Sequence, residues 1–426
     1  MTSHALTAPF SHRQDPGPLL RLRRQWALFA ALGALFLFSG ALFLAPRFWP
    51  ATPQAPLLWF LTAAAALIWQ MFYLWHHLAE NHREGEEAIL PVLGAGNALT
   101  LFRGFGFAAV AGFVLSPKPE GLWLWVPAAI YLLAVCADYA DGWMARKTDH
   151  CTALGKKLDM ELDSLGMAVA TALAVQYGQL PLWYLTLAAA PYLWRVLVWM
   201  REHHSGRAVE LPESNARRLL AGTQMGFIAT VLFPLFQPPV TTAAAVAFGL
   251  PYGLMFVRDG FLMFGKIAPD SPLHPSAPRP PRFVPAAGFV ARWATVVLGA
   301  LTLEALFGPA LRGDLSMGIF AGRGVALAWL LGGVGGLAVL LIAAGWLERT
   351  SAFLLLLIVS AFSLSRNVGA AEIALIASAI AVMHFGSGPL SFVSPEDRFL
   401  SGRAGLEEEE ARRAEEEFLR HSGLRT

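Results

Sequence analysis

Charged residues are scarce in this chain of 426 residues. Asp, Glu, Lys and Arg make up 15% of the sequence, and hydrophobic residues make up 56%. Soluble domains carry nearer a quarter of charged residues, so the composition excludes an ordinary soluble protein. The net charge of +2 is too small to indicate a nucleic-acid partner, and none is expected.

Cysteine is also nearly absent. Only Cys136 and Cys151 occur, and their spacing fits neither a zinc site nor a disulfide framework. Both flank a region that we place on the cytoplasmic side, where thiols stay reduced. We interpret them as free thiols without a catalytic or metal-binding role.

Long apolar runs dominate what is present, and they alternate with short charged segments. Runs near 20 residues can span a bilayer as helices. The sequence therefore predicts an all-α polytopic membrane protein of about twelve transmembrane helices. The predicted spans are residues 26–45, 57–75, 99–116, 121–140, 160–177, 182–200, 219–236, 240–257, 287–307, 324–346, 350–365 and 370–388.

The placement of basic residues predicts the orientation of these spans. Lys and Arg favour cytoplasmic loops, and they gather in 21–24, 146–157, 201–218 and 266–292. We therefore expect an inner-membrane protein with both termini in the cytoplasm. Arg312 and Arg323 fall in a loop predicted to lie outside, against this rule.

One break in composition suggests how the chain is organised. Residues 268–286 hold seven prolines and cannot form a regular helix. We expect five parts: a cytoplasmic segment with two spans (1–95), a central six-span domain (96–267), this proline-rich linker (268–286), a four-span domain (287–394) and a charged tail (395–426).

Four aspartates carry the clearest chemical signal. Asp138 and Asp141 are three residues apart at the end of one span, and Asp159 and Asp163 are four apart at the start of the next. Each pair shares a helix face, and the short connection makes the two helices antiparallel neighbours. The spacing therefore predicts that four carboxylates converge at the cytoplasmic boundary.

Such a cluster calls for positive charge, since four close carboxylates cannot all stay ionised without it. Mg²⁺ or Mn²⁺ would supply it, because hard cations bind carboxylates together with substrate phosphates. Arg146 is placed to grip a phosphate. The small residues Gly142, Ala145 and Gly155 would let a nucleotide approach the backbone.

These residues match a family pattern. Residues 138–163 fit D-x-x-D-G-x-x-A-R-x8-G-x3-D-x3-D at every fixed position, and 97–103 fit N-x-L-T-x-x-R. The chain thus resembles the CDP-alcohol phosphotransferases over residues 97–257. Downstream, Arg217, Arg218 and Thr223 to Met225 are loosely similar to the basic loop and following helix of phosphatidylglycerophosphate synthases.

The resemblance implies a reaction and roles for the site residues. A phosphoalcohol group would pass from a CDP-alcohol, with CDP-diacylglycerol as the expected donor, to an acceptor hydroxyl, with release of CMP, in phospholipid biosynthesis. Asp138, Asp141, Asp159 and Asp163 would hold metal, and Asp163 would act as general base. The CDP pocket would be lined by Gly142, Ala145, Arg146, Gly155, Asn97 and Thr100. Dimers are common in the family, which makes a homodimer a candidate assembly.

The acceptor is a small polar or phosphorylated alcohol that the sequence does not identify. Arg195 lies deep in a predicted span, and Arg201 follows at its inner end. Together with Arg217 and Arg218 they are candidates for binding an acceptor phosphate. For Arg195 a side chain that simply reaches the interface fits equally well.

Other acidic residues lie off the pattern. We expect Asp149 and Glu161 on the surface. In the C-terminal half Glu304, Glu348 and Glu372 occur singly, and Glu304 and Glu372 are candidates for buried polar contacts in the membrane. The small-residue packing of that half and its closing stretch 385–392 with Asp397 resemble the DoxX-like membrane proteins, which implies an accessory role.

Two other functions compete with this interpretation. An intramembrane prenyltransferase also binds a magnesium diphosphate through paired Asp-rich motifs, but those motifs lie far apart in sequence. A membrane transport or assembly protein with a degenerate site is the non-enzymatic alternative. The presence of every fixed residue of the pattern argues against it.

Overall fold

The computed structural model describes residues 16–83, 85–205, 215–268, 271, 273–274, 283–312, 324–363, 368–386 and 388. It divides into two units, residues 1–169 and 170–426, and helix α6 passes from the first unit into the second. Among the described residues there are helices and one isolated bridge between Arg83 and Thr152, and no strand.

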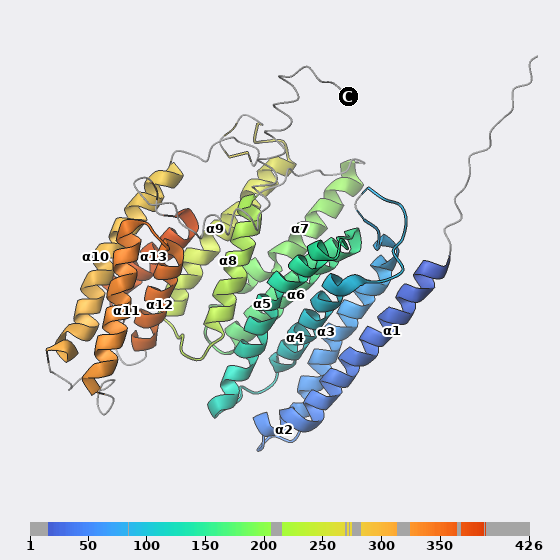
Figure 1. Ribbon diagram of the computed structural model, residues 1–426, viewed down its shortest axis with the longest axis horizontal. Coiled ribbons are helices and arrows are strands. Elements are labelled where there is room, and N and C mark those ends of the chain that lie inside the picture. Colours follow the sequence, from blue (N-terminus) through green and yellow to red (C-terminus); the bar gives the residue numbers. More distant parts are fainter. Residues whose placement is uncertain are drawn as a thin grey trace, which may run out of the picture. The chain divides into compact units, whose positions relative to one another are not determined.

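The first unit contains the helices that carry the acidic cluster (Figure 1). Its α-helices are α1 (Pro16–Ser39), α2 (Ala45–Phe48), α3 (Ala55–His77), α4 (Gly94–Phe113), α5 (Val126–Lys147) and the larger part of α6 (Ala153–Gln176). A short π-helix (η1) occurs at Gly40–Leu44, and two short 3₁₀-helices (η2 and η3) occur at Leu78–Glu80 and Gly121–Trp125. Prolines stand in the first turn of α2, α3 and α5, where a missing backbone N–H costs no hydrogen bond.

Helix α4 is the central helix of this unit. It packs against α1, α3 and α5, and most of its side chains are buried. The approach to α5 is close at Gly96, where a Cβ atom would lie 2.8 Å from Cβ of Ala145 and 3.1 Å from the carbonyl oxygen of Asp141. Small residues at such crossings bring helix backbones together in membrane proteins. A charged residue in the middle of α4 must therefore find its partners within the protein.

The second unit contains two groups of helices. Helices α7 (Tyr184–Ser205), α8 (Asn215–Val231) and α9 (Val240–Met263) are tied together by Gln224, which accepts a hydrogen bond from Tyr184 and donates one to the Phe248 carbonyl at 2.6 Å. Helices α10 (Phe283–Leu311), α11 (Gly324–Ala344), α12 (Glu348–Ser363) and α13 (Ala370–Phe385) surround one apolar core. Helix α13 packs against α9, where the rings of Phe248 and His384 lie 5.2 Å apart.

All twelve predicted spans coincide with a helix, which confirms an all-α polytopic membrane protein. Six helical segments among the described residues are long and apolar enough to cross a bilayer. They are Gly17–Phe48, Ala55–Glu80, Gly121–Lys147, Val240–Met263, Val284–Pro309 and Ala326–Ala344. Leu219–Val231 and Ala370–Phe385 are shorter apolar helices. The predicted domain boundaries stay predictions, and most of the linker and all of the tail lie outside the described residues.

Two predictions for isolated acidic residues are wrong. Glu304 is exposed and pairs with Arg312, with Oε1 and Nη1 2.6 Å apart. Glu372 accepts a hydrogen bond from the Gly369 backbone N–H at 3.0 Å, so it caps the start of α13 instead of lying buried in a span. Glu348 is 2% exposed. Glu348 begins α12, and a Cβ added at Gly386, the residue after α13, would lie 3.9 Å from its Oε1 and 3.4 Å from Arg349 Nη2.

Candidate active site

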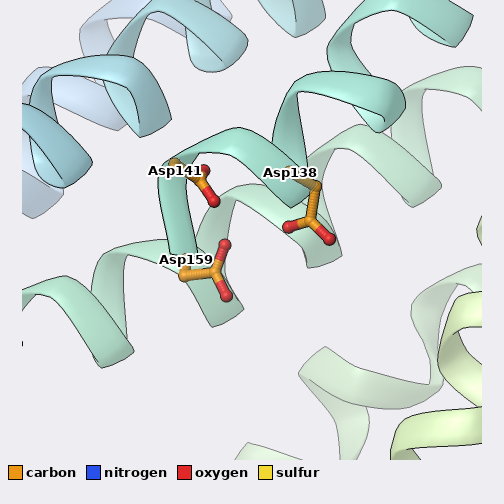
Figure 2. Close-up of side chains that lie close together, drawn as sticks. All are labelled: Asp138, Asp141 and Asp159. Atoms are coloured by element: carbon orange, nitrogen blue, oxygen red, sulfur yellow. The ribbon is translucent and has the colours of Figure 1, made fainter. Parts of the chain in front are cut away.

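Three of the four predicted aspartates come together as the spacing indicates. Asp138 and Asp141 project from α5 and Asp159 from α6, and their carboxylates point toward one another (Figure 2). One oxygen from each carboxylate lies within 4.8 Å of the other two. The i, i+3 spacing places the first two on one helix face, and the short loop 148–152 returns the chain so that the third faces them.

The fourth aspartate is joined to this group by a residue from a third helix. Arg103 of α4 places Nη1 at 3.0 Å from Asp138, 2.6 Å from Asp141 and 2.9 Å from Asp159. Its Nη2 forms an ion pair with Asp163. One guanidinium therefore contacts all four carboxylates, in the charge-assisted geometry that gives strong hydrogen bonds.

Burial differs across the cluster and gives it an open side. The Arg103 side chain is fully buried, and that of Asp141 is 6% exposed, whereas those of Asp163 and Asp159 are 31% and 43% exposed. Asp141 is held further by Thr100, which donates to it at 3.0 Å, and by the backbone N–H of Gly142 at 2.6 Å. The α6 carboxylates are thus the ones that solvent or substrate reaches.

The donor set fits a hard divalent cation. Four carboxylates against one guanidinium leave a formal charge of three negative units, counted with every aspartate ionised. Carboxylate oxygens from two facing helices are ligands that Mg²⁺ and Mn²⁺ accept. The residues that would hold such an ion are Asp138, Asp141 and Asp159, with Asp163 beside them.

The residues predicted for the CDP pocket lie next to this cluster, in two places. Arg146 is exposed at the end of α5, and its Nη1 would lie 3.3 Å from a Cβ at Gly142. At the start of α6 a Cβ at Gly155 would lie 2.5 Å from Oδ1 of Asn97. Asn97 itself donates to the Leu93 carbonyl at 2.8 Å and contacts Thr152.

Three of these predicted residues therefore have a packing role as well. Ala145 packs against Gly96, Thr100 holds Asp141, and Gly155 leaves room for Asn97. The close approach of α4 explains the small residue at 145, and the Asn97 side chain explains the one at 155, in both cases without a ligand. Whether they also contact a nucleotide stays a prediction.

The basic residues predicted for an acceptor phosphate belong to the second unit. Arg195 of α7 lies 4.7 Å from the centre of the Tyr192 ring, and Arg201 lies 5.4 Å from that of Phe264. Arg217 of α8 forms an ion pair with the buried Asp259, with Nε and Oδ2 3.1 Å apart. The side chain of Arg218 lies outside the described residues.

Sequence reasoning missed two residues around the acids. Arg103 appeared only as the last position of a motif, although it stands at the centre of the cluster. Glu161 was expected on the surface, and that prediction is wrong, because it is 1% exposed and accepts a hydrogen bond from Trp69 at 2.9 Å. Asp149 is exposed as expected and pairs with Arg83. The signal for Arg103 was present, since a lone arginine in an apolar helix needs acidic partners.

Fold and site together define a helical membrane enzyme whose acidic centre suits phosphate-bearing substrates. Residues 94–255 match the family model of CDP-alcohol phosphatidyltransferase. Three similar proteins are each named CDP-diacylglycerol–glycerol-3-phosphate 3-phosphatidyltransferase. The Yersinia enterocolitica protein is 29% identical over 142 residues, 32% of this chain and 74% of its own length. The Yersinia pestis protein is 30% identical with the same coverage, and the Pectobacterium atrosepticum protein is 34% identical over 113 residues, 24% of this chain and 58% of its own. No solved structure matches the chain.

The chain therefore belongs to the CDP-alcohol phosphatidyltransferase family. It is a transferase of substituted phosphate groups that acts in phospholipid biosynthesis by CDP-alcohol phosphotransfer. Divalent-metal dependence is general in the family, in agreement with the carboxylate cluster. Membership removes the prenyltransferase alternative, and the intact carboxylate cluster argues against the alternative of a degenerate site.

Proposed function

We propose that Asp138, Asp141 and Asp159 hold Mg²⁺ or Mn²⁺ against the diphosphate of the donor. The supporting observation is the convergence of their oxygens within 4.8 Å of one another, around Nη1 of the buried Arg103. A bound divalent ion would supply positive charge to the diphosphate oxygens and to the departing CMP. The protein's own task is then to position the reactants, because phosphoryl transfer needs little covalent work from side chains.

CDP-diacylglycerol is the proposed donor. The matched relatives carry that donor in their names, and a lipid donor suits a site at the end of apolar helices. Arg146 is exposed on the α5 end of the cluster, and its guanidinium would bind a phosphate oxygen. Gly142 and Gly155 with Asn97, Thr100 and Ala145 would form the wall behind the cytidine.

Asp163 is the proposed general base. It lies on α6 one turn beyond Asp159 and is more exposed than Asp141, so an acceptor hydroxyl can reach it. Asp163 would take the hydroxyl proton while the acceptor oxygen attacks the phosphorus that carries the lipid. A new oxygen–phosphorus bond forms, the bond between that phosphorus and the bridging oxygen breaks, and CMP leaves with both electrons.

Glycerol 3-phosphate is the proposed acceptor, because it appears in the names of the relatives. Its phosphate carries negative charge and needs cations. Arg195, Arg201, Arg217 and Arg218 are the candidates, and the described ones lie on α7 and α8 of the second unit. The ion pair of Arg217 with the buried Asp259 fixes the direction of that guanidinium.

The site is proposed to face the cytoplasm of an inner membrane, with both chain ends on that side and a homodimer as the assembly. Basic residues at 146–147 and 156–157 flank the loop between α5 and α6, which supports this orientation. Cys151 is exposed in the same loop. In a Cys136→Ala variant, a membrane-impermeant maleimide should label Cys151 in inside-out vesicles and leave it unlabelled in right-side-out vesicles.

The reaction is tested with purified protein, CDP-diacylglycerol and Mg²⁺ or Mn²⁺. The acceptor panel contains glycerol 3-phosphate, inositol phosphate, serine and a second lipid. We expect CMP release that depends on glycerol 3-phosphate. We also expect a lipid product in which the phosphatidyl group of the donor is joined to glycerol 3-phosphate. CMP release with another acceptor alone would replace the proposed acceptor. No CMP release with any acceptor would overturn the proposed donor.

A further inference from the structure

A segment outside the family match reaches the loop that joins the two acidic helices. Residues 69–93 precede the matched region 94–255, and they contact residues 149–161. At the backbone, the Ala153 N–H donates to the His82 carbonyl at 3.0 Å, beside the bridge between Arg83 and Thr152. This segment, with α1 and the rest of α3 before it, carried no readable chemistry in the sequence.

Arg83 binds Asp149, two residues after the end of α5. Its Nε and Nη2 donate to the Asp149 carbonyl at 3.2 and 3.0 Å, and Nη2 lies 3.0 Å from the Asp149 carboxylate. Asp149 has a φ of 49°, in the left-handed region that aspartate adopts more readily than most residues with a side chain. Arg83 therefore helps to hold the left-handed turn between Asp141 and Asp159.

His150 makes a second contact between the loop and this segment. Its Nε2 lies 3.0 Å from the Val92 carbonyl oxygen. Gly94 has a φ of +83°, and a Cβ there would lie 2.1 Å from the His150 ring. Only glycine satisfies both the backbone angle and the contact. An ion pair between Glu80 and Lys157, 2.7 Å long, adds a third link.

Helix α3 also contacts the two helices that carry the charged groups. Trp69 Nε1 donates to the buried Glu161 at 2.9 Å, and Glu161 lies midway between Asp159 and Asp163 on α6. Gln70 donates to the Gly104 carbonyl at 2.8 Å, one residue after Arg103 on α4. The first contact restrains rotation of α6, and the second restrains the backbone of α4 behind the guanidinium.

We propose that residues 69–93 are a positioning element for the donor site, acting through Trp69 on α6 and through Arg83 on the loop. The proposal rests on the proposed function of the acidic cluster. Neither residue touches the reacting atoms, so both are positioning residues. Outer partners that orient metal ligands are typically worth about 10- to 100-fold in metal affinity or activity.

The first test compares two substitutions that each remove one indole hydrogen bond. Trp69→Phe loses the bond to Glu161, whereas the control Trp49→Phe loses a 2.7 Å bond to the Pro117 carbonyl, outside both residues 69–93 and α6. Mn²⁺ binding to the purified protein is followed by electron paramagnetic resonance in the absence of substrate. We expect Trp69→Phe to bind Mn²⁺ about 10-fold or more weakly and Trp49→Phe to bind it as the wild type does. Equal Mn²⁺ affinity in both variants would overturn the role of Trp69.

The second test uses Arg83→Ala and Arg83→Lys, with Arg24→Ala on the exposed face of α1 as control. Lysine keeps the charge toward Asp149 but cannot make both bonds to its carbonyl. We expect KM for CDP-diacylglycerol to rise about 10-fold in Arg83→Ala and less in Arg83→Lys, with kcat reduced less than kcat/KM. If KM stays unchanged in both Arg83 variants while the wild type turns over, the role of Arg83 is refuted. A wild type that releases no CMP would instead refute the proposed function.

Discussion

Arg103 Nη1 lies 2.6 Å from Oδ2 of Asp141, although the two residues are 38 positions apart and on different helices. The same guanidinium contacts Asp138, Asp159 and Asp163. It is fully buried, and burial of an unpaired charge is costly, so the four acids and Arg103 stabilise one another. A divalent ion at the three closest carboxylates would share this role.

Arg103→Ala should make stability depend on metal. Removing one member of a buried ion pair costs about 3–5 kcal/mol, because the remaining charges lose their partner. In the presence of chelator we expect the melting temperature of Arg103→Ala to lie well below that of the wild type. Added Mg²⁺ or Mn²⁺ should raise the melting temperature of the variant more than that of the wild type, so that the gap narrows. Thermal unfolding in detergent, with and without metal, measures this. A deficit that metal does not reduce would contradict a shared role for Arg103 and the cation.

Asp163→Asn should abolish turnover while donor binding largely survives. An amide keeps the shape of the side chain but cannot take the acceptor proton, and loss of a general base costs about 10²- to 10⁴-fold in rate. CMP release measures turnover, and CDP-diacylglycerol binding is measured separately. Glu120→Gln, an exposed carboxylate before α5, is the control and should match the wild type. Loss of donor binding together with activity would make Asp163 an essential metal ligand instead.

Removal of divalent metal should stop the reaction. We expect no CMP release after exhaustive chelation, and full recovery with Mg²⁺ or Mn²⁺, because oxygen ligands prefer hard cations. Ca²⁺, which is larger and accepts irregular coordination, should bind without supporting the full rate. Activity that persists after chelation would remove the metal from the mechanism.

Gly155→Ala should weaken the site through packing. The added Cβ would lie 2.5 Å from Asn97 Oδ1, so Asn97 or α6 must shift. Such overpacking typically costs about 1–3 kcal/mol, and we expect a lower melting temperature with a raised KM for the donor. Gly222→Ala in α8 is the matched control, since no heavy atom lies within 4 Å of its added Cβ. Equal behaviour of the two variants would show that position 155 has room to spare.

The sequence by itself determined the helical membrane fold and the meeting of the aspartates. Apolar runs of bilayer length define helices because every backbone group must find a partner within its own segment. Spacings of three and four place Asp138 with Asp141 and Asp159 with Asp163 on shared faces, and the short loop makes those faces neighbours. These relations are local, so the order of residues is enough to predict them.

Only the tertiary structure decided which partners complete the site. Arg103 reaches the acids across 35 to 60 positions, and Trp69 reaches Glu161 across 92. Glu161 is buried although charged residues surround it in the sequence, and Glu304 is exposed although its sequence neighbours are mostly apolar. Burial of a charge depends on which helix packs beside it, and helix packing is set by side-chain contacts between distant segments, which no local spacing encodes.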